Sequence, residues 1–124
     1  MPRPTQGRRA LRAQVADELR CLGDTKDEVA QRLEAVGVRG RPGNASDCAL
    51  AVYLSAVVAA DPRVHAVHVA YDRVFIRLDS RWWYVGVPLP KTLRRFVEDF
   101  DHRRYPALVR PLTDADQSTE HASR

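Results

Sequence analysis

The chain has 124 residues, of which 44% are hydrophobic and 29% are charged. This length leaves room for one domain with one core, and the composition is ordinary for a globular protein. The net charge of +4 is modest for a protein that compacts nucleic acid, and arginine supplies most of the basic residues, with 18 Arg against 2 Lys. Two cysteines are too few for a disulfide framework.

No segment of the sequence predicts a membrane anchor or a secretory signal. The first residues lack the apolar stretch of a signal peptide. The longest apolar run, residues 49–60, is well short of the roughly 20 residues that span a bilayer. We therefore expect a cytoplasmic protein without a membrane partner.

Residues 1–24 predict a basic N-terminal arm with a possible helix. The first ten residues hold two prolines, a glycine and three arginines, which favours a flexible segment. From Ala10 to Leu22, apolar residues recur every four positions, which is typical of a helix, and Gly23-Asp24 then ends it. The basic residues of the arm are Arg3, Arg8, Arg9 and Arg12.

Residues 25–112 are expected to form the compact domain, and two helices begin it. Thr25 and Glu28 form a capping box ahead of the apolar positions Val29 and Leu33, and Gly37 is the expected end. Residues 39–44 are rich in Gly, Arg and Pro and predict a loop. A second, almost entirely apolar helix then follows to about residue 60, with Asn44 or Ser46 as its cap.

Residues 63–88 predict a three-stranded antiparallel meander. Two-residue turns at Tyr71-Asp72 and Asp79-Ser80 would pair Val69 with Val74, Val67 with Ile76, and Ile76 with Trp83. Alternation then divides the strands into two faces. The face expected to cover the core holds His65, Val67, Val69, Val74, Ile76, Leu78, Trp83 and Val85.

A last helix should begin at Pro90 and end near Arg104, because Tyr105 precedes a proline. Its apolar stripe is Leu93, Phe96, Val97 and Phe100. Leu108, Val109 and Leu112 are expected to fold back onto the core, and residues 113–124 form a polar tail with a composition typical of disorder.

The order of these elements predicts an α+β fold, with a single small domain built as helix–helix–three-stranded antiparallel meander–helix. The helices should pack on one face of the sheet, because the apolar face of the meander must be covered. The apolar stripes of the second helix and the last helix are the expected covers.

Two segments resemble a group of short uncharacterised proteins of actinobacteria and their mobile elements. One is a Gly-rich loop leading to a cysteine and an Ala-x-Tyr-Leu helix, GVRGRPGNASDCALAVYL, at residues 37–54. The other is VPLPKTLRRFVEDFDHRRYPALV, at residues 87–109. The resemblance covers about residues 25–110. It implies a compact domain and no particular activity.

The second face of the meander is the main candidate for function. It combines arginine with aromatic residues, a set that provides most hot spots in protein interfaces and that also suits base stacking with phosphate neutralisation. Alternatively, the first helix or the arm covers this face. The candidate residues are His68, Arg73, Phe75, Arg77, Trp82 and Tyr84, with Arg39, Arg41 and Asn44 in the preceding loop.

These residues favour a non-catalytic binding or regulatory module that acts on a protein partner, self-association included. The alternative is a nucleic-acid-binding protein that uses the basic arm together with the same face. A weaker third hypothesis is a thiol-dependent enzyme or redox sensor at Cys48, near a predicted helix start. No catalytic constellation, cofactor fingerprint or metal-ligand spacing is present in the sequence, so we expect no enzyme activity, no cofactor and no metal.

Overall fold

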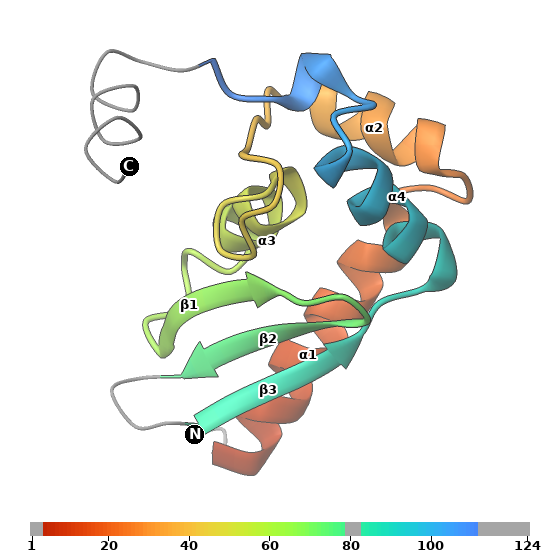
Figure 1. The fold of residues 1–124 in the computed structure, drawn as a ribbon. Helices are drawn as coiled ribbons and strands as arrows, with labels where there is room; N and C mark the ends of the chain where they lie inside the picture. Colours follow the sequence, from red (N-terminus) through yellow and green to blue (C-terminus); the bar gives the residue numbers. More distant parts are fainter. Residues whose placement is uncertain (1–3, 79–82, 112–124) are drawn as a thin grey trace, which may run out of the picture.

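The computed structural model describes residues 4–78 and 83–111. These residues form four α-helices, a three-stranded sheet and a short 3₁₀-helix (Figure 1). In chain order the elements are α1 (Pro4–Cys21), α2 (Lys26–Ala35), α3 (Ala49–Val57), β1 (Val64–Val69), β2 (Arg73–Leu78), β3 (Trp83–Pro88), α4 (Lys91–Asp101) and η1 (Pro106–Leu108).

The strands form an antiparallel sheet in the order β1-β2-β3, so the predicted α+β fold is confirmed. Helix α1 passes behind the sheet and contacts β3, while α3 contacts β1 (Figure 1). The last helix differs from the expectation that it covers the sheet, because α4 packs mainly against α2. The apolar stripe of α4 therefore packs into the core next to α2.

The register of the first hairpin is the predicted one. Val69 pairs with Val74 and Val67 pairs with Ile76. The amide of Ala70 donates to the carbonyl of Arg73 at 2.8 Å, which closes the turn at Tyr71-Asp72.

The register of the second hairpin differs from the prediction by two residues. Trp83 pairs with Leu78, and Ile76 pairs with Val85, so the predicted pairing of Ile76 with Trp83 is wrong. A shift of two residues keeps every side chain on its predicted face, because strand side chains alternate with a period of two. The predicted turn at Asp79-Ser80 lies outside the described residues.

The core face of the sheet is apolar, with one exception to the prediction. The register between β1 and β2 shifts between Val64 and Ala66, as in a β-bulge. This irregularity leaves His65 exposed and packs Val64 against the core, so His65 does not belong to the core face. The side chain of Trp83 lies outside the described part of the structure. The buried residues of this face are Val67, Val69, Val74, Ile76, Leu78, Val85 and Val87.

The N-terminal segment is more ordered than its composition predicts. Helix α1 begins at Pro4, within the segment expected to be flexible, and proline is well tolerated at a helix start. Leu11, Val15 and Leu19 are at most 2% exposed and belong to the common core. The compact unit therefore extends N-terminal to residue 25 and includes α1.

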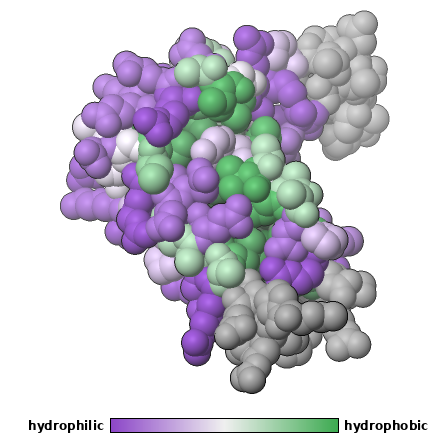
Figure 2. All heavy atoms as spheres, turned by 180° about the vertical axis from the view of Figure 1, so that it is seen from behind, coloured by the Kyte–Doolittle hydropathy of each residue, from purple (hydrophilic) through white to green (hydrophobic). Residues whose placement is uncertain are grey.

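Partly buried hydrophobic residues border this core, among them Ala16, Tyr53 and Val57. In the view from behind, hydrophobic residues reach the surface in the middle of the molecule, and hydrophilic residues surround them (Figure 2). The Tyr53 hydroxyl donates to Glu18 at 2.8 Å, which ties α3 to α1.

The helix ends follow local hydrogen bonding. The Thr25 hydroxyl accepts the Glu28 amide at 3.2 Å, as in a capping box, and the Glu28 carboxylate accepts the Asp24 amide at 3.1 Å. Helix α3 begins later than predicted, at Ala49. The side chain of Asn44 accepts the Ser46 amide at 3.1 Å and so stabilises a turn in the loop instead of capping the helix.

Helix α4 ends at Asp101, earlier than predicted, and the chain then returns to the core. Leu108 is buried in η1, and Val109 packs beside it. Gly40 and Val109 form an isolated parallel bridge, with the Gly40 amide donating to the Leu108 carbonyl at 2.8 Å. Leu112 and the predicted tail at 113–124 lie outside the described residues.

Candidate functional sites

The face of the sheet opposite the core carries the predicted aromatic set. His68 from β1, Phe75 from β2 and Tyr84 from β3 line a shallow depression of about 450 Å³. Tyr84 is 44% exposed. Because α1 passes behind the sheet, Figure 1 looks onto this face. We call His68, Arg73, Phe75, Arg77 and Tyr84 the outer face.

The rings of the outer face have a fixed arrangement. Phe75 pairs directly with Gly86, and Tyr84 pairs with Arg77, so the two aromatic residues are diagonal neighbours. Their ring centroids lie 6.2 Å apart at 84°, an edge-to-face contact. On the other side of Phe75, His68 Nδ1 lies 2.7 Å from the Ser46 hydroxyl, which orients the imidazole. These contacts fix the relative positions of three neighbouring side chains.

Arginine flanks these rings on the central strand. Arg73 is exposed across from Pro88, and Arg77 is half-buried across from Tyr84. Both arginines thus share the face with the rings, as the sequence predicts. Trp82, which the sequence places on the same face, lies outside the described residues.

In the structure, α1 does not cover the outer face, because it packs on the core face. Within residues 4–78 and 83–111, no helix passes in front of this face in the view of Figure 1. The described basic residues of the predicted arm lie on α1. Arg9 and Arg12 are exposed on α1 and Arg8 is half-buried, whereas Arg3 lies outside the described residues.

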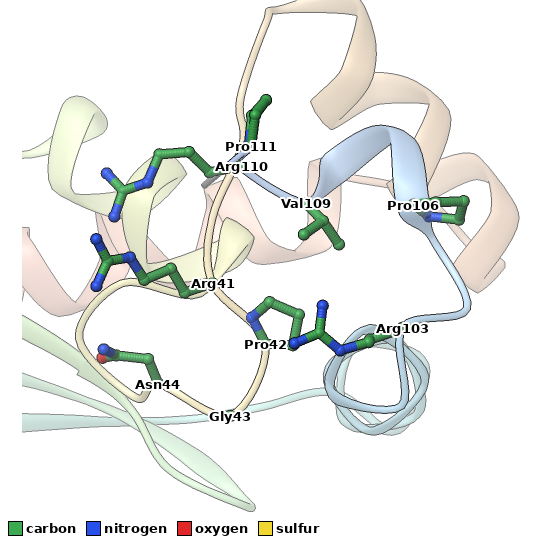
Figure 3. A pocket seen from close by; sticks show the side chains of 9 residues that line it. All are labelled: Arg41, Pro42, Gly43, Asn44, Arg103, Pro106, Val109, Arg110 and Pro111. Carbon is green, nitrogen blue, oxygen red and sulfur yellow. The ribbon is translucent and has the colours of Figure 1, made fainter. Parts of the chain in front are cut away.

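The residues of the loop at 39–44 lie next to two different parts of the structure. Beyond its end, the Ala45 carbonyl accepts the Val69 amide at 2.8 Å, so the chain there adjoins the edge of β1. The side chain of Arg41 extends beside that of Arg110 from the C-terminal segment (Figure 3). Arg39 and Asn44 are exposed. The predicted loop residues therefore do not form one site with the outer face.

A second arginine site was not predicted from the sequence. Arg41, Arg103 and Arg110 line a cleft of about 690 Å³ between the loop and the C-terminal segment (Figure 3). The bridge between Gly40 and Val109 brings Arg41 and Arg110 together. No motif marks that bridge, since its two residues are far apart in the sequence and neither belongs to a regular strand.

The environment of Cys48 is unlike that of a reactive thiol. It precedes α3 and is only 3% exposed. Burial raises the pKa of the Cys48 thiol, which keeps it protonated at neutral pH. Its side chain is part of the hydrophobic core.

Asp99 is a buried acid on α4. It is 7% exposed and accepts hydrogen bonds from Lys26 at 2.5 Å and from Arg104 at 2.9 Å. The Lys26 ammonium, more than Arg104, lowers the pKa of the Asp99 carboxyl. Since both partners balance its charge, Asp99 links α4 to α2 and has the features of a structural ion pair.

Two further features are absent from the described residues. No group of three or more His, Cys, Asp and Glu residues among them is placed to hold a metal ion. None of the helices in this part of the chain combines the length and apolar character needed to cross a membrane. Comparison of the chain with protein-family models, with curated proteins and with solved structures found no match.

Proposed function

We propose that the protein is a small non-catalytic binding module that recognises a protein partner through the outer face. The observation that carries this proposal is the edge-to-face pair of Phe75 and Tyr84, which lies beside His68 on a sheet face that the described helices leave uncovered. Large aromatic residues exposed in a fixed arrangement lose little conformational entropy on binding, which is why Tyr and Trp are frequent hot spots.

The arginines of the outer face suit the rim of such an interface. Arg73 and Arg77 lie on both sides of Phe75 along β2. An arginine beside an aromatic ring offers charge, hydrogen-bond donors and a flat stacking surface at once. The expected partner surface is therefore apolar in the middle, where it meets Phe75 and Tyr84, and acidic at its edge.

Nucleic acid is the alternative ligand of this face. It would need phosphate contacts along an extended basic surface. The arginines of α1 belong to a helix on the core face of the sheet, so they do not extend the surface formed by Arg73 and Arg77. This separation favours the protein partner.

The test compares proteins captured by the immobilised full chain from an extract of the source organism, treated with nuclease. Tyr84→Ala removes the exposed ring of the outer face. Tyr71→Ala is the matched control, because Tyr71 is 81% exposed in the β1–β2 turn. A partner that the wild-type chain and Tyr71→Ala retain should bind Tyr84→Ala at least about tenfold more weakly. Equal retention by both variants would contradict the proposal.

A salt titration separates the two ligands. Binding to mixed-sequence DNA and RNA is measured at low and high salt, for the wild-type chain and for Arg73→Gln. Steep loss of binding with rising salt, weakened further by Arg73→Gln, would establish nucleic acid as the ligand. We expect no binding that depends on Arg73 at either salt concentration.

A further inference from the structure

Strand β3 forms an open edge of the sheet. The Leu89 amide donates to the Asp72 carbonyl at 3.0 Å, and hydrogen-bonded pairs alternate with non-bonded pairs along an antiparallel ladder. In the observed register, Val85 therefore directs its backbone groups towards β2, whereas Tyr84 and Gly86 direct theirs away from the sheet. In the described part of the chain, no segment forms a backbone hydrogen bond with these two residues on that side.

The opposite edge of the sheet is partly closed. Val69 on β1 donates its outward amide to the Ala45 carbonyl at 2.8 Å, so the preceding loop occupies part of that edge. An edge strand with unpaired amides and carbonyls is a template for pairing with another chain. The sheet thus offers β3 to an added strand more fully than β1.

Gly86 lies at this open edge, on the same face as Phe75, and the described chain does not require a glycine there. Its φ is not positive, and the pairing with β2 continues through it without a bulge. A Cβ atom at Gly86 would lie 3.5 Å from Arg73 Nη1 and 3.9 Å from Phe75 Cε1, which are ordinary contact distances. A glycine weakens a strand interior and often marks a position that another backbone or a ligand approaches closely.

Arg73 supplies a positive charge at the same place. The contact of its Nη1 with the Cβ position of Gly86 puts the guanidinium over that glycine, on the outer face and beside the open edge. Within the described residues, this guanidinium has no ion-pair partner. A carboxylate on an added strand opposite Gly86 would lie next to it and could accept charge-assisted hydrogen bonds.

We propose that β3 takes up an extended segment of the protein partner as a fourth strand, with an acidic side chain of that segment opposite Gly86. The proposal rests on the proposed function, because the added strand continues the outer face. Main-chain hydrogen bonds then give affinity, and alternate side chains give specificity. Since alternate residues of a strand share a face, the residue opposite Tyr84 is two positions from the acidic one and should be apolar. The partner segment therefore has an acidic and an apolar residue with one residue between them.

The test selects random peptides about nine residues long, displayed on phage, against the immobilised full chain, because this length can pair with all of β3. We expect the enriched peptides to share an acidic and an apolar residue with one residue between them. An enriched peptide is then methylated at one backbone amide at a time. Binding should weaken about tenfold at alternate positions only, because only alternate amides bond to an edge strand. Enriched peptides without an acidic residue, or methylation effects without alternation, would overturn the proposal.

Two variants of the chain test the backbone and the charge separately. Gly86→Pro removes an amide that the ladder with β2 does not use, and proline is tolerated on edge strands, so circular dichroism should show an intact fold. It should weaken peptide binding about tenfold or more. Arg73→Gln should weaken binding about tenfold for a peptide with glutamate, and not for the same peptide with glutamine. Equal loss for both peptides would contradict the assigned ion pair.

Arg95→Gln is the matched control for charge, since Arg95 is exposed on α4. It removes the same charge as Arg73→Gln and should leave peptide binding unchanged. Equal weakening by Arg95→Gln and Arg73→Gln would show that net charge, and not the position of Arg73, attracts the acidic peptide, which would overturn the proposal.

The outcomes also separate strand addition from the proposed function. Binding that Tyr84→Ala abolishes and that Gly86→Pro leaves unchanged would overturn strand addition and keep the outer face as the binding surface. If no peptide is enriched, strand addition is overturned, and the capture experiment with Tyr84→Ala still decides the proposed function. Sedimentation of the free chain tests a second copy as the occupant. A dimer that Gly86→Pro dissociates would overturn the proposal of a partner segment.

Discussion

The central strand β2 presents two chemically different surfaces within six residues. Val74, Ile76 and Leu78 are buried against the helices, and Val74 and Ile76 are completely inaccessible. On the other side, Arg73 is exposed and Phe75 is half-buried. The strand thus separates two tasks. Its core face carries the burial that stabilises the fold, and its outer face carries side chains that the fold needs much less.

The largest effect is expected from the core face. Ile76→Ala should lower the free energy of unfolding by about 2–5 kcal/mol, because it opens a cavity at the centre of the sheet that the packed helices cannot fill. Urea denaturation followed by circular dichroism measures this loss. A cost below about 1 kcal/mol would mean that Ile76 is not packed as the structure has it.

A somewhat smaller effect is expected where α1 covers the core face. Leu11→Ala should lower the free energy of unfolding by about 2–3 kcal/mol, since Leu11 is 2% exposed near the free end of a helix that can partly relax. The exposed Ala13 of the same helix offers the matched position, and Ala13→Gly should cost about 1 kcal/mol through helix propensity alone. If Leu11→Ala costs no more than Ala13→Gly, α1 is not packed against the core and is a loose arm.

The smallest effect is expected on the outer face, beside Ile76 in the same strand. Phe75→Ala should cost roughly 0.5–1.5 kcal/mol, because it removes an edge-to-face contact and only partial burial. The same urea experiment measures it. Destabilisation equal to that of Ile76→Ala would break the division between the faces and make Phe75 a core residue.

Alternation along the strands was enough to predict which residues share a face, because the period of two survives a register shift of two residues. It was not enough to predict the direct partners of Ile76 and Trp83, which depend on the length of the second connection. It also misplaced His65, since the irregularity in β1 has no marker in the sequence. Patterns of local periodicity do not record such interruptions.

The arginine cleft shows a different limit. Arg41 belongs to a loop that the sequence singles out, but Arg103 and Arg110 come from a segment some sixty residues later. Only the bridge from Gly40 to Val109 assembles them. The predicted helix end near Arg104 was placed from the proline that follows, while the structure ends α4 at Asp101, ahead of the left-handed Arg103. Contacts between distant irregular segments leave no periodic pattern.

The most direct test of the account is the alkylation rate of a thiol introduced on the outer face by Tyr84→Cys, measured with iodoacetamide in the dilute, isolated protein. The chain supplies its own references, because Cys21 is exposed and Cys48 is buried. Peptide mass spectrometry then gives all three rates in one sample. The account predicts that the thiol at position 84 reacts at a rate close to that of Cys21. A rate as slow as that of Cys48 would show that the chain itself covers this face, and would contradict its role as a binding surface.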